Sequence, residues 1–544
     1  MSHRTQISNN PHYLSCLPYG AGHGSEGICL LLQLGKYRIL LDCGLEKIEP
    51  LIAKADFALD WIFCSHAHVD HARGLLALHQ AAPHIPIYAS EVTSILLPLN
   101  WQEALPDDFC QSLPWKTPIA LAEDLSIELY PAGHLPGAAC LALTYSTPTR
   151  VYKIFYTGDF SVSNSQFVEG LSIETLRGLA PDVLIIEGTY GTRRHSHRRQ
   201  QEKQLMSKTL QALGRGENIL FPVPPLGIGQ EILKLMRSHH QFTGRDLDIW
   251  VDGMVAQACN LYLDLLPQFP ASVQNFAKHQ PLFWDERICP RMHRLQDLKQ
   301  INSSYPCIVF ADWQEDLIPY LQASEHPWLV LLPEYPLLPF ADEIVKQLAS
   351  ETFQPEINVD SYLLSEHSDG RNTTQLIHNL RPQHIVFVHG LPNYLADLTG
   401  LEELRNRYQL HTPSAETLVH FPLGEKFIQP ATSIPAHYEG EINEAGSFIN
   451  ISIPDDITLD PRWEKFAETG LVEVRWQGEE IVIKGISQRE LLSQSSGGKR
   501  LVDVDCCSNC EYYRGQRCWN MKSPLYGFRV TPEGYCPAFS RKQE

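Results

Sequence analysis

The sequence predicts a water-soluble α/β protein built from several domains. Apolar segments with strand character alternate with segments of helical spacing over most of the first 430 residues, which is typical of α/β architecture. The chain has 544 residues, more than a single hydrophobic core usually serves. Its content of 43% hydrophobic and 20% charged residues is that of a globular protein in water.

The first third of the chain is predicted to be rich in strands. Residues 28–42 read as two strands that turn at Gly35 and Lys36. Residues 59–64 form a short apolar run, and the segment after it has the apolar spacing of a helix. Further strands are expected at residues 126–130, 151–157 and 182–191, the last running into a glycine-containing loop.

The middle of the chain alternates between helices and strands. Helices are predicted at residues 200–213 and 229–237, with strand-like segments NILFPVP and LDIWVDG on either side of the second helix. A late strand is expected at residues 383–390. After residue 430 the segments FINISIP and LVEVRWQGEEIVIKG alternate at period two, which indicates a small β-rich module, and residues 493–499 have the composition of a flexible linker.

Charge and cysteine usage limit the functional classes. A net charge of −19 disfavours a protein that coats nucleic acid by general charge attraction, although it leaves room for a local basic groove. No stretch has the roughly 18 uninterrupted apolar residues of a membrane span, and the N-terminus has no apolar signal region, so a cytoplasmic location without a membrane partner is predicted. Five of the 14 cysteines crowd into residues 506–536, which favours a metal-binding tail in a reducing compartment over a disulfide framework.

The segment HAHVDH concentrates four ligand-type residues on a loop between a predicted strand and a predicted helix: His66, His68, Asp70 and His71. Imidazole and carboxylate groups suit zinc and similar divalent ions, and four of them this close can serve two ions. A surface loop with incidental histidines is the simpler interpretation of any one of these residues. It accounts poorly for all four together.

Three further candidate ligands follow predicted strands. His134 lies in AGHLPGA, Asp159 in YTGDFS and His389 in VFVHG, each in a glycine-containing turn. A single histidine at a strand end is more often structural. Three such residues in the same kind of turn favour a shared site on a rigid scaffold.

These motifs resemble, in this order, those of the metallo-β-lactamase superfamily: RILLDCG, SHAHVDHARG, AGHLPGA and YTGDFS. Three more segments, LIIEGTYG, LSEHSDG and VFVHG, resemble the extra motifs of its β-CASP branch, which includes RNA-processing endonucleases, ribonuclease J-like enzymes and DNA-repair nucleases. The segments GTRRHSHRRQQEKQL, PPLGIGQE and WVDGMVAQA are similar to β-CASP insert sequence. The resemblance covers roughly residues 12–425.

The resemblance implies a metallo-β-lactamase αββα sandwich interrupted by an inserted α/β β-CASP-like domain. The first part of the sandwich is expected at residues 1–190, the insert at 191–358 and the return segment at 359–430. A small β-rich module at residues 431–492 and a linker with a Cys-rich tail at 493–544 complete the predicted organisation.

The resemblance also implies a centre for two Zn²⁺ ions. The implied ligands form two groups joined by a shared carboxylate: His66, His68 and His134 for the first ion, Asp70, His71 and His389 for the second, and Asp159 for both. Asp42 would orient these ligands from behind. Two ions so placed can share a water, lower its pKa and neutralise phosphoryl charge.

The leaving oxygen of a cleaved phosphodiester needs a proton. The resemblance implies His367, in SEHSDG, as its donor and Glu187 as the carboxylate that orients and charges the imidazole, so that Glu187, His367 and the ligand Asp70 are the candidate catalytic residues. Taken alone, Glu187 would be read as a turn carboxylate and His367 as a surface-loop histidine. The family pattern favours the functional interpretation of both.

Two segments depart from the β-CASP pattern. Ile228 in LGIGQE stands where an arginine is common, and residues 307–317, with Asp312 and Glu315, replace a glycine-rich loop. Both changes weaken the expected grip on phosphate and leave the metal centre intact. The basic run at residues 192–200 offers a phosphate contact, although such a run is as often a solvated face.

The tail contains a second candidate metal site. Cys507 and Cys510 have the spacing of a metal knuckle, Cys518 and Cys536 would complete a four-thiolate set, and Cys506 is a spare or alternative ligand. Zn²⁺ and a [4Fe–4S] cluster are both compatible with these thiolates. The role predicted is structural, because four protein thiolates leave no position for a substrate.

The predicted function is that of a metal-dependent hydrolase, a two-zinc phosphodiesterase or ribonuclease that cleaves RNA by a metal-bound hydroxide, with DNA as the less favoured substrate. Two alternatives stay open. A hydrolase of small esters or thioesters on the same scaffold is favoured by the acidic charge and the altered insert loops. A non-catalytic RNA-processing assembly protein is disfavoured by the presence of all seven ligand positions. The sequence leaves open whether the chain forms homo-oligomers and whether cleavage is internal or stepwise from a 5′ end.

Overall fold

A computed structural model gives the arrangement of most of the chain. The described residues are 12–24, 26–53, 58–301, 306–337, 356–423, 441–445, 448–452, 472–477, 480–485, 507–514, 517–521 and 539–542. The chain divides into two compact units, Met1–Gln429 and Pro430–Glu544. Within the described ranges, no helix combines the length and apolar character needed to cross a membrane.

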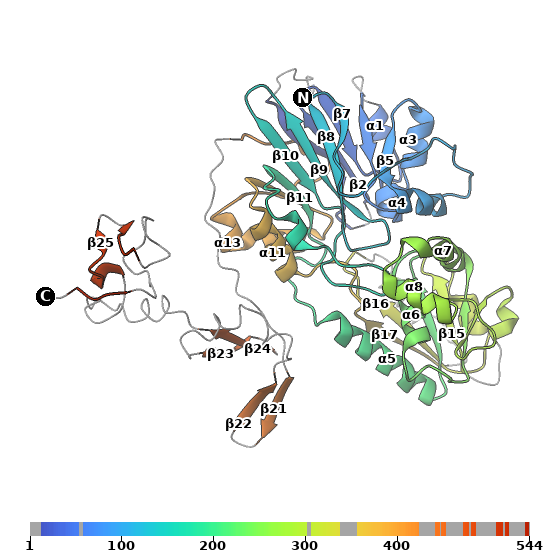
Figure 1. Cartoon of the computed structure of the whole chain (residues 1–544). Helices are drawn as coiled ribbons and strands as arrows, with labels where there is room; N and C mark the ends of the chain where they lie inside the picture. Colours follow the sequence, from blue (N-terminus) through green and yellow to red (C-terminus); the bar gives the residue numbers. More distant parts are fainter. Residues whose placement is uncertain are drawn as a thin grey trace. The chain divides into compact units, whose positions relative to one another are not determined.

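Two seven-stranded sheets form a sandwich in the first unit (Figure 1). The first sheet has the order β20-β1-β2-β3-β4-β5-β6, with bounds β1 Leu14–Ala21, β2 Ile28–Leu34, β3 Tyr37–Leu41, β4 Trp61–Phe63, β5 Ile87–Ser90, β6 Gln111–Leu113 and β20 Val419–His420. The second has the order β19-β18-β11-β10-β9-β8-β7, with bounds β7 Ile119–Ala122, β8 Leu125–Pro131, β9 Ala139–Ser146, β10 Val151–Tyr156, β11 Val183–Glu187, β18 His384–Val388 and β19 Gln409–His411.

Alternation along the strands builds the core between the two sheets. Leu30 and Leu32 of β2 point into this core together with Leu141 and Ile154 of the second sheet, whereas Leu31 points to the opposite face. Successive side chains of a strand point to opposite faces, and the run of leucines at residues 30–32 is apolar on both because the second sheet covers one face of β2 and helices cover the other.

Helices cover the outer face of each sheet. The helices beside the first sheet are α1 Glu49–Ile52, α2 Val69–Ala72, α3 Leu75–Ala81, α4 Glu91–Leu96 and the 3-10 turn η1 Leu97–Asn100. Those beside the second are η2 Ile173–Leu176, α11 Gly370–Leu380, α12 Pro392–Gly400 and α13 Glu402–Arg405. This layering confirms the predicted αββα sandwich.

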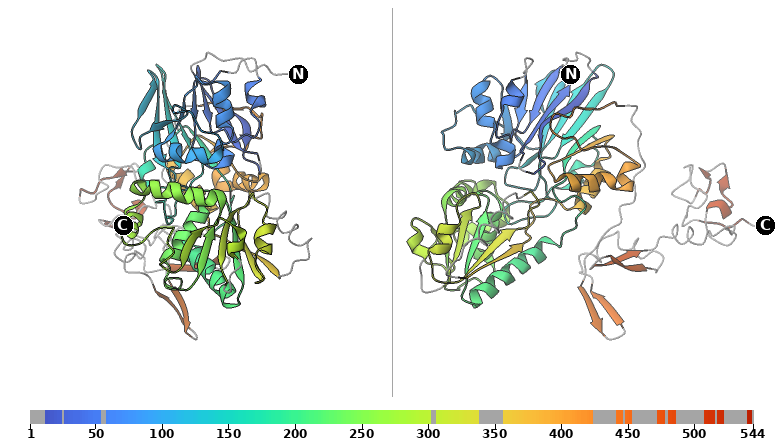
Figure 2. Two further views of the ribbon diagram at one scale, coloured as in Figure 1. Left: turned by 90° about the vertical axis from the view of Figure 1, so that its right-hand side faces the viewer. Right: turned by 180° about the vertical axis from the view of Figure 1, so that it is seen from behind.

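A separate six-stranded sheet lies between β11 and β18 in the sequence, and its neighbouring strands all run parallel. Its order is β14-β13-β15-β12-β16-β17, with bounds β12 Asn218–Val223, β13 Asp248–Val251, β14 Arg291–Arg294, β15 Ile308–Asp312, β16 Trp328–Pro333 and β17 Ile357–Tyr362. The domain lies against one end of the sandwich (Figure 2). The chain therefore leaves the sandwich after β11 and returns with α11 and β18, as an inserted α/β domain does.

Helices flank this sheet as well. They are α5 Arg198–Gly214, α6 Ile228–Ser238, α7 Gly253–Asp264, η3 Leu266–Gln268, α8 Ala271–His279, η4 Leu298–Ile301 and α9 Ile318–Gln322. Phe221 of β12 packs with α5 and α6 on one face, while Leu220 packs with Leu321 of α9 on the other. β17 runs past residue 358, where the sequence analysis ended the insert.

The second unit contains short hairpins. β21 Glu441–Ala445 pairs with β22 Phe448–Ser452, and β23 Val472–Gln477 pairs with β24 Glu480–Gly485, both antiparallel. The described residues of the two segments predicted from their period-two alternation form strands of these hairpins. In the tail, η5 Cys507–Asn509 precedes the pair β25 Tyr513–Arg514 and β26 Arg517–Cys518. The predicted linker, Cys506 and Cys536 lie outside the described residues.

Candidate metal centre

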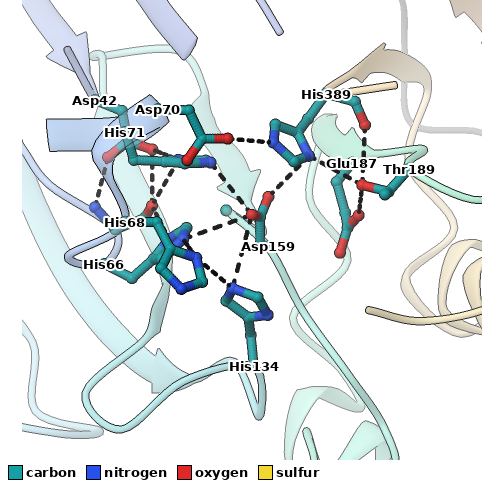
Figure 3. Close-up of polar contacts among 12 residues, drawn as sticks. Asp42, His66, His68, Asp70, His71, His134, Asp159, Glu187, Thr189 and His389 are labelled. Carbon is teal, nitrogen blue, oxygen red and sulfur yellow. Dashed lines mark hydrogen bonds and ion pairs between the residues drawn. The ribbon is translucent and has the colours of Figure 1, made fainter. Parts of the chain in front are cut away.

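The predicted ligands lie on loops that leave one edge of the sandwich. β10, β11 and β18 are mutually parallel, and β8 runs the same way because β9 is antiparallel to both β8 and β10. The carboxyl ends of these strands therefore meet, and they carry His134, Asp159, Glu187 and His389. The HAHVDH segment follows β4 of the facing sheet, with its last two ligands in the first turn of α2. Figure 3 shows the side chains converging.

One group of ligand atoms surrounds the end of His68. Nε2 of His66 lies 3.2 Å and Nε2 of His134 lies 3.1 Å from Nδ1 of His68. Asp159 Oδ2 lies 3.5 Å from His66 Nε2 and 3.8 Å from His134 Nε2. The ligand atoms of these four residues all lie within 4.8 Å of one another, a spacing that one ion can fill.

A second group lies on the other side of Asp159. Asp70, His71 and His389 offer ligand atoms within 4.8 Å of one another, and Asp70 Oδ2 lies 3.1 Å from His389 Nε2. Asp159 reaches this group too, because its Oδ2 lies 3.2 Å from His71 Nε2. The structure thus brings all seven predicted side chains together, with the carboxylate of Asp159 between the two groups.

Buried hydrogen bonds set which nitrogen of each imidazole faces the centre. Asp42 Oδ2 accepts from Nδ1 of His71 at 2.8 Å, which leaves Nε2 of His71 as the inward ligand atom. His134 donates from Nδ1 to the backbone oxygen of Glu366 at 2.9 Å, with the same result. A hydrogen bond on the far nitrogen is the usual way in which proteins orient metal-binding histidines.

His68 is turned the other way, and the inserted domain contributes to this. Its Nδ1 faces the centre, while its Nε2 lies 3.4 Å from the backbone oxygen of Leu226 in the loop after β12. That loop continues through Gly227, which has φ 97°, and a Cβ there would lie 2.6 Å from Oε1 of Glu366. Only glycine adopts this backbone conformation without strain and leaves room for the carboxylate.

A second glycine brings two ligand loops together. Gly158 has φ 52°, and a Cβ on it would lie 2.7 Å from the Cβ of Ser65. Without a side chain at this position, the loop of Asp159 reaches the HAHVDH loop, where Ser65 Oγ lies 3.0 Å from Nδ1 of His66.

The electrostatics of the centre suit a bound cation. Burial lowers the pKa of His66 and His134 well below the ordinary value, and that of His68 to about 4, so all three imidazoles keep a free lone pair. Burial acts against charge on His71 as well, but the carboxylates of Asp159 and Asp42 outweigh it and raise its pKa.

Two buried atoms of the centre, His71 Nε2 and Asp159 Oδ1, have no hydrogen bond of good geometry with a described residue. Each has only an ion-pair contact, at 3.2 Å to Asp159 Oδ2 and at 3.3 Å to His389 Nδ1 respectively. Buried polar atoms without partners are rare in folded proteins. The set of five imidazoles and two carboxylates, two of whose inward-facing atoms lack a hydrogen bond of good geometry, fits Zn²⁺ coordination.

Glu187 and His367 form a buried pair beside the centre. Nδ1 of His367 lies 3.0 Å from both carboxylate oxygens of Glu187. Thr189 donates its hydroxyl to Glu187 Oε2, and the amide of Phe160 donates to Oε1 at 2.8 Å, so the carboxylate is fixed in place. Burial acts to lower the pKa of His367, but Glu187 outweighs it and raises that pKa to about 9.

Comparisons with known proteins agree with this geometry. A family model described as "Beta-lactamase superfamily domain" matches residues 37–221, and one described as "Zn-dependent metallo-hydrolase RNA specificity domain" matches residues 356–405. Over 536 residues the chain is 50% identical to the uncharacterized protein sll0514 of Synechocystis sp., covering 97% of this chain and 96% of that protein. The chain belongs to the metallo-β-lactamase superfamily, in its β-CASP branch.

Named relatives of this β-CASP chain are more distant. It is 28% identical over 258 residues to "Probable RNase MJ4" of Methanocaldococcus jannaschii, covering 43% of this chain and 58% of that protein. It is 24% identical over 424 residues to "Integrator complex subunit 11" of Danio rerio, covering 69% and 68% of the two chains. The family assignment makes the chain a metallo-hydrolase and confirms the resemblance drawn from its motifs.

A cavity of about 1020 Å³ lies beside the metal centre of this β-CASP chain. His68, Asp70 and His367 line it from the sandwich side, and Leu226 and Trp313 line it from the six-stranded domain. The carboxylates along its described wall are Asp70, Asp312, Glu334 and Glu366, whereas Arg73 supplies the guanidinium. Burial, with Glu231 nearby, raises the pKa of Glu366 to about 8.

Two arginines of the basic run predicted as a phosphate contact make contacts within the β-CASP fold instead. Arg198 is buried and its Nη2 lies 3.1 Å from Oε2 of Glu231. Arg193 places its guanidinium 4.6 Å from the centre of the Tyr394 ring. Arg194 and Arg199 are exposed, so the contact with phosphate stays a prediction for these two.

Several site residues escaped the sequence analysis. Thr189 touches both Glu187 and His389, with its hydroxyl 2.9 Å from Nδ1 of the latter. Tyr156 donates to Oδ2 of Asp42 at 2.6 Å, and Tyr335 stacks on His367. Thr189 stands two residues after Glu187 in the motif LIIEGTYG, a position that could have been found. Tyr335 comes from the inserted domain, and no sequence pattern marks it.

Proposed function

We propose that the chain is a two-zinc phosphodiesterase that cleaves RNA. The observation that supports this most is a juxtaposition: two groups of ligand atoms share Asp159, and the Glu187–His367 pair lies directly beside them. The names of the relatives agree with it, since one is called a probable RNase. A centre with two ligand groups and a separate imidazole supplies what phosphodiester hydrolysis requires on both sides of phosphorus.

Some residues of the site would hold the metal ions, and His367 would transfer a proton. The two groups that meet at Asp159 would each hold one ion, and such ions, when bound, activate a water and neutralise phosphoryl charge. Asp42 holds His71 in the required orientation. His367 has its Nδ1 committed to Glu187, so Nε2 is the ring nitrogen left for a substrate in the cavity.

Proton delivery is the role proposed for His367. Its imidazole carries a proton at neutral pH, because Glu187 stabilises the charge. A proton given from Nε2 to the departing 3′-oxygen would leave one product with a 3′-hydroxyl and the other with a 5′-phosphate. A positioned acid of this kind contributes about 10²–10⁴-fold to the rate.

The test is cleavage of end-labelled single-stranded RNA by the zinc-loaded chain. We expect products that carry 5′-phosphates, and loss of cleavage in Asp159→Ala, because this change removes the carboxylate common to both groups. Asp60→Ala is the matched control, since Asp60 accepts a hydrogen bond on the exposed side of the sandwich. An Asp159→Ala chain that cleaves as fast as wild type would overturn the proposal.

A second candidate, a hydrolase of small esters or thioesters, is supported by the charge of the cavity. Apart from the candidate ligand Asp70, and from Glu366, which its raised pKa keeps largely protonated at neutral pH, the described wall sets Asp312 and Glu334 against Arg73 and His367. It therefore offers no excess of positive charge to a polyanion. Turnover of a thioester by the zinc-loaded chain, without cleavage of any RNA, would favour this candidate over the first.

A further inference from the structure

Among the described residues, four aromatic rings lie around the imidazole of His367. Those of His134 and Tyr190 are inclined to it, with centroids 4.6 Å and 6.2 Å away. The ring of His389 is nearly parallel to it, with centroids 5.8 Å apart and an angle of 20° between planes. The phenol ring of Tyr335 also stacks on it, with centroids 5.4 Å apart and the same 20° angle. Offset stacking of this kind holds one aromatic plane relative to another.

Tyr335 belongs to a different domain from the pair that it touches. It follows β16 of the six-stranded sheet, where its amide donates to the backbone oxygen of Pro333 at 2.9 Å. The neighbouring Glu334 accepts a 3.1 Å hydrogen bond from the hydroxyl of Tyr190 at its backbone oxygen. The segment is thus tied to the sandwich next to the cavity, and Tyr335 lines that cavity.

The other contacts of His367 show what the ring of Tyr335 contributes. The hydrogen bonds to Glu187 fix Nδ1 but leave the imidazole free to rotate about the Nδ1 contact. The loop around it lies between β17 and α11, where Ser365 donates to the backbone oxygen of His367 at 2.7 Å. These bonds do not set the plane of the imidazole, which depends on the rings packed around it. Of these rings, that of Tyr335 comes from the inserted domain and stacks nearly parallel on the imidazole.

We propose that Tyr335 is a positioning residue: its ring fixes the plane of the His367 imidazole, so that Nε2 points at the leaving oxygen while Nδ1 stays on Glu187. This inference rests on the proposed function of His367. It makes proton delivery depend on the inserted domain, because the ring that sets the angle of the acid comes from that domain.

The ring, rather than the hydroxyl, carries this role. Among the described residues, none makes a hydrogen bond with the hydroxyl of Tyr335, so the side chain is held by its ring contacts. Phenylalanine would keep those contacts, and leucine would fill similar space without a flat face. The pair of substitutions therefore separates stacking from bulk and from hydrogen bonding.

The experiment compares two substrates that differ in their need for an acid. RNA has a poor leaving group and needs the proton, whereas bis(p-nitrophenyl) phosphate has one acidic enough to depart without it. We expect Tyr335→Leu to lower kcat on RNA by about 10–100-fold, part of the contribution of a general acid, with its rate on bis(p-nitrophenyl) phosphate within about twofold of wild type. Tyr335→Phe should restore RNA cleavage to within about twofold of wild type.

Controls separate this role from a structural one. Tyr408→Leu removes a tyrosine that contacts another histidine, His378, away from the cavity, and it should leave both rates unchanged. Zinc content, the thermal unfolding midpoint and the affinity of the metal-free chain for a single-stranded RNA should be the same in Tyr335→Leu as in wild type. Weaker RNA binding in the metal-free variant would show a substrate contact and overturn the positioning role.

The remaining outcomes are also decisive. Equal losses on both substrates would mean that Tyr335 supports the metal centre, and equal losses in the Phe and Leu variants would assign the effect to the hydroxyl. Either result overturns the inference. If wild type cleaves no RNA at all, the proposed function fails instead, and the comparison between variants does not arise.

Discussion

Asp42 and His71 are joined by a 2.8 Å hydrogen bond from Nδ1 to Oδ2, and both side chains are completely buried. Asp42 also accepts from Ser65 and Tyr156, so its carboxylate is surrounded by donors. Its backbone has φ 57°, an unusual conformation for a residue other than glycine, which the hydrogen bonds on both sides maintain. The carboxylate thus sets the tautomer of a candidate ligand.

We expect Asp42→Asn to weaken zinc binding by about 10–100-fold, because an amide can present its NH₂ group to Nδ1 and favour the wrong tautomer of His71. Competition with a chromophoric chelator measures the affinity. Asp60→Asn, on the exposed side, is the control and should bind zinc like wild type. Unchanged affinity in Asp42→Asn would show that His71 is oriented by something else.

Glu187 and His367 are expected to act as one unit. Glu187→Gln and His367→Ala should each lower RNA cleavage by about 10²–10⁴-fold, and the double variant should be no slower than the worse single one. The reason is that the carboxylate works only through the imidazole that it holds. Single-turnover rates of the four chains give the coupling, and simple additivity of the two losses would contradict a shared role.

Acid should lower the stability of the folded chain, in part by protonating a histidine pair that is remote from the metal centre. His384 donates from Nε2 to the backbone oxygen of Pro422, so its Nδ1 accepts from Nε2 of His411 at 3.0 Å. Burial, with His384 beside it, lowers the pKa of His411 to about 4. The unfolded chain therefore binds more protons between that value and the ordinary 6.5, so this contribution is complete above about pH 6.5 and is lost as the pH falls toward 4.

His411→Gln should flatten this dependence, because glutamine can donate to His384 without titrating. Thermal midpoints of the metal-free chain between pH 7.5 and about 5 measure it. His279→Gln, at the exposed end of α8, is the control and should follow wild type. A His411→Gln chain that loses midpoint as steeply as wild type would contradict the prediction.

The tail metal site stays a prediction with its own test. Cys507, Cys510 and Cys518 are buried, and they are the buried apolar side chains among the described residues of the tail. Replacing Cys507 and Cys510 with serine should remove one metal equivalent, or one cluster, and expose the tail to protease while the catalytic zinc remains. Metal analysis gives the stoichiometry, and visible absorption separates a [4Fe–4S] cluster from colourless zinc. Unchanged metal content would refute the site.

The motifs determined the metal centre's composition because ligand chemistry is local. The types and spacing of residues 66–71 already indicate a metal-binding loop, and the nearly continuous apolar run around Leu30 is typical of a strand covered on both faces. The pairing of Glu187 with His367 came from family resemblance, since 180 residues separate them. Their contact in space depends on the loop between β17 and α11, which brings His367 back to Glu187 at the carboxyl end of β11.

What the tertiary structure alone decided lies where two domains meet. The inserted domain supplies two contacts, the backbone oxygen of Leu226 beside His68 and the ring of Tyr335 on His367. No sequence motif marks either residue as functional. The sequence by itself determined which groups could bind metal and carry a proton. The docking of the six-stranded domain decided the angles at which those groups are held, because orientation depends on contacts between segments that are remote along the chain.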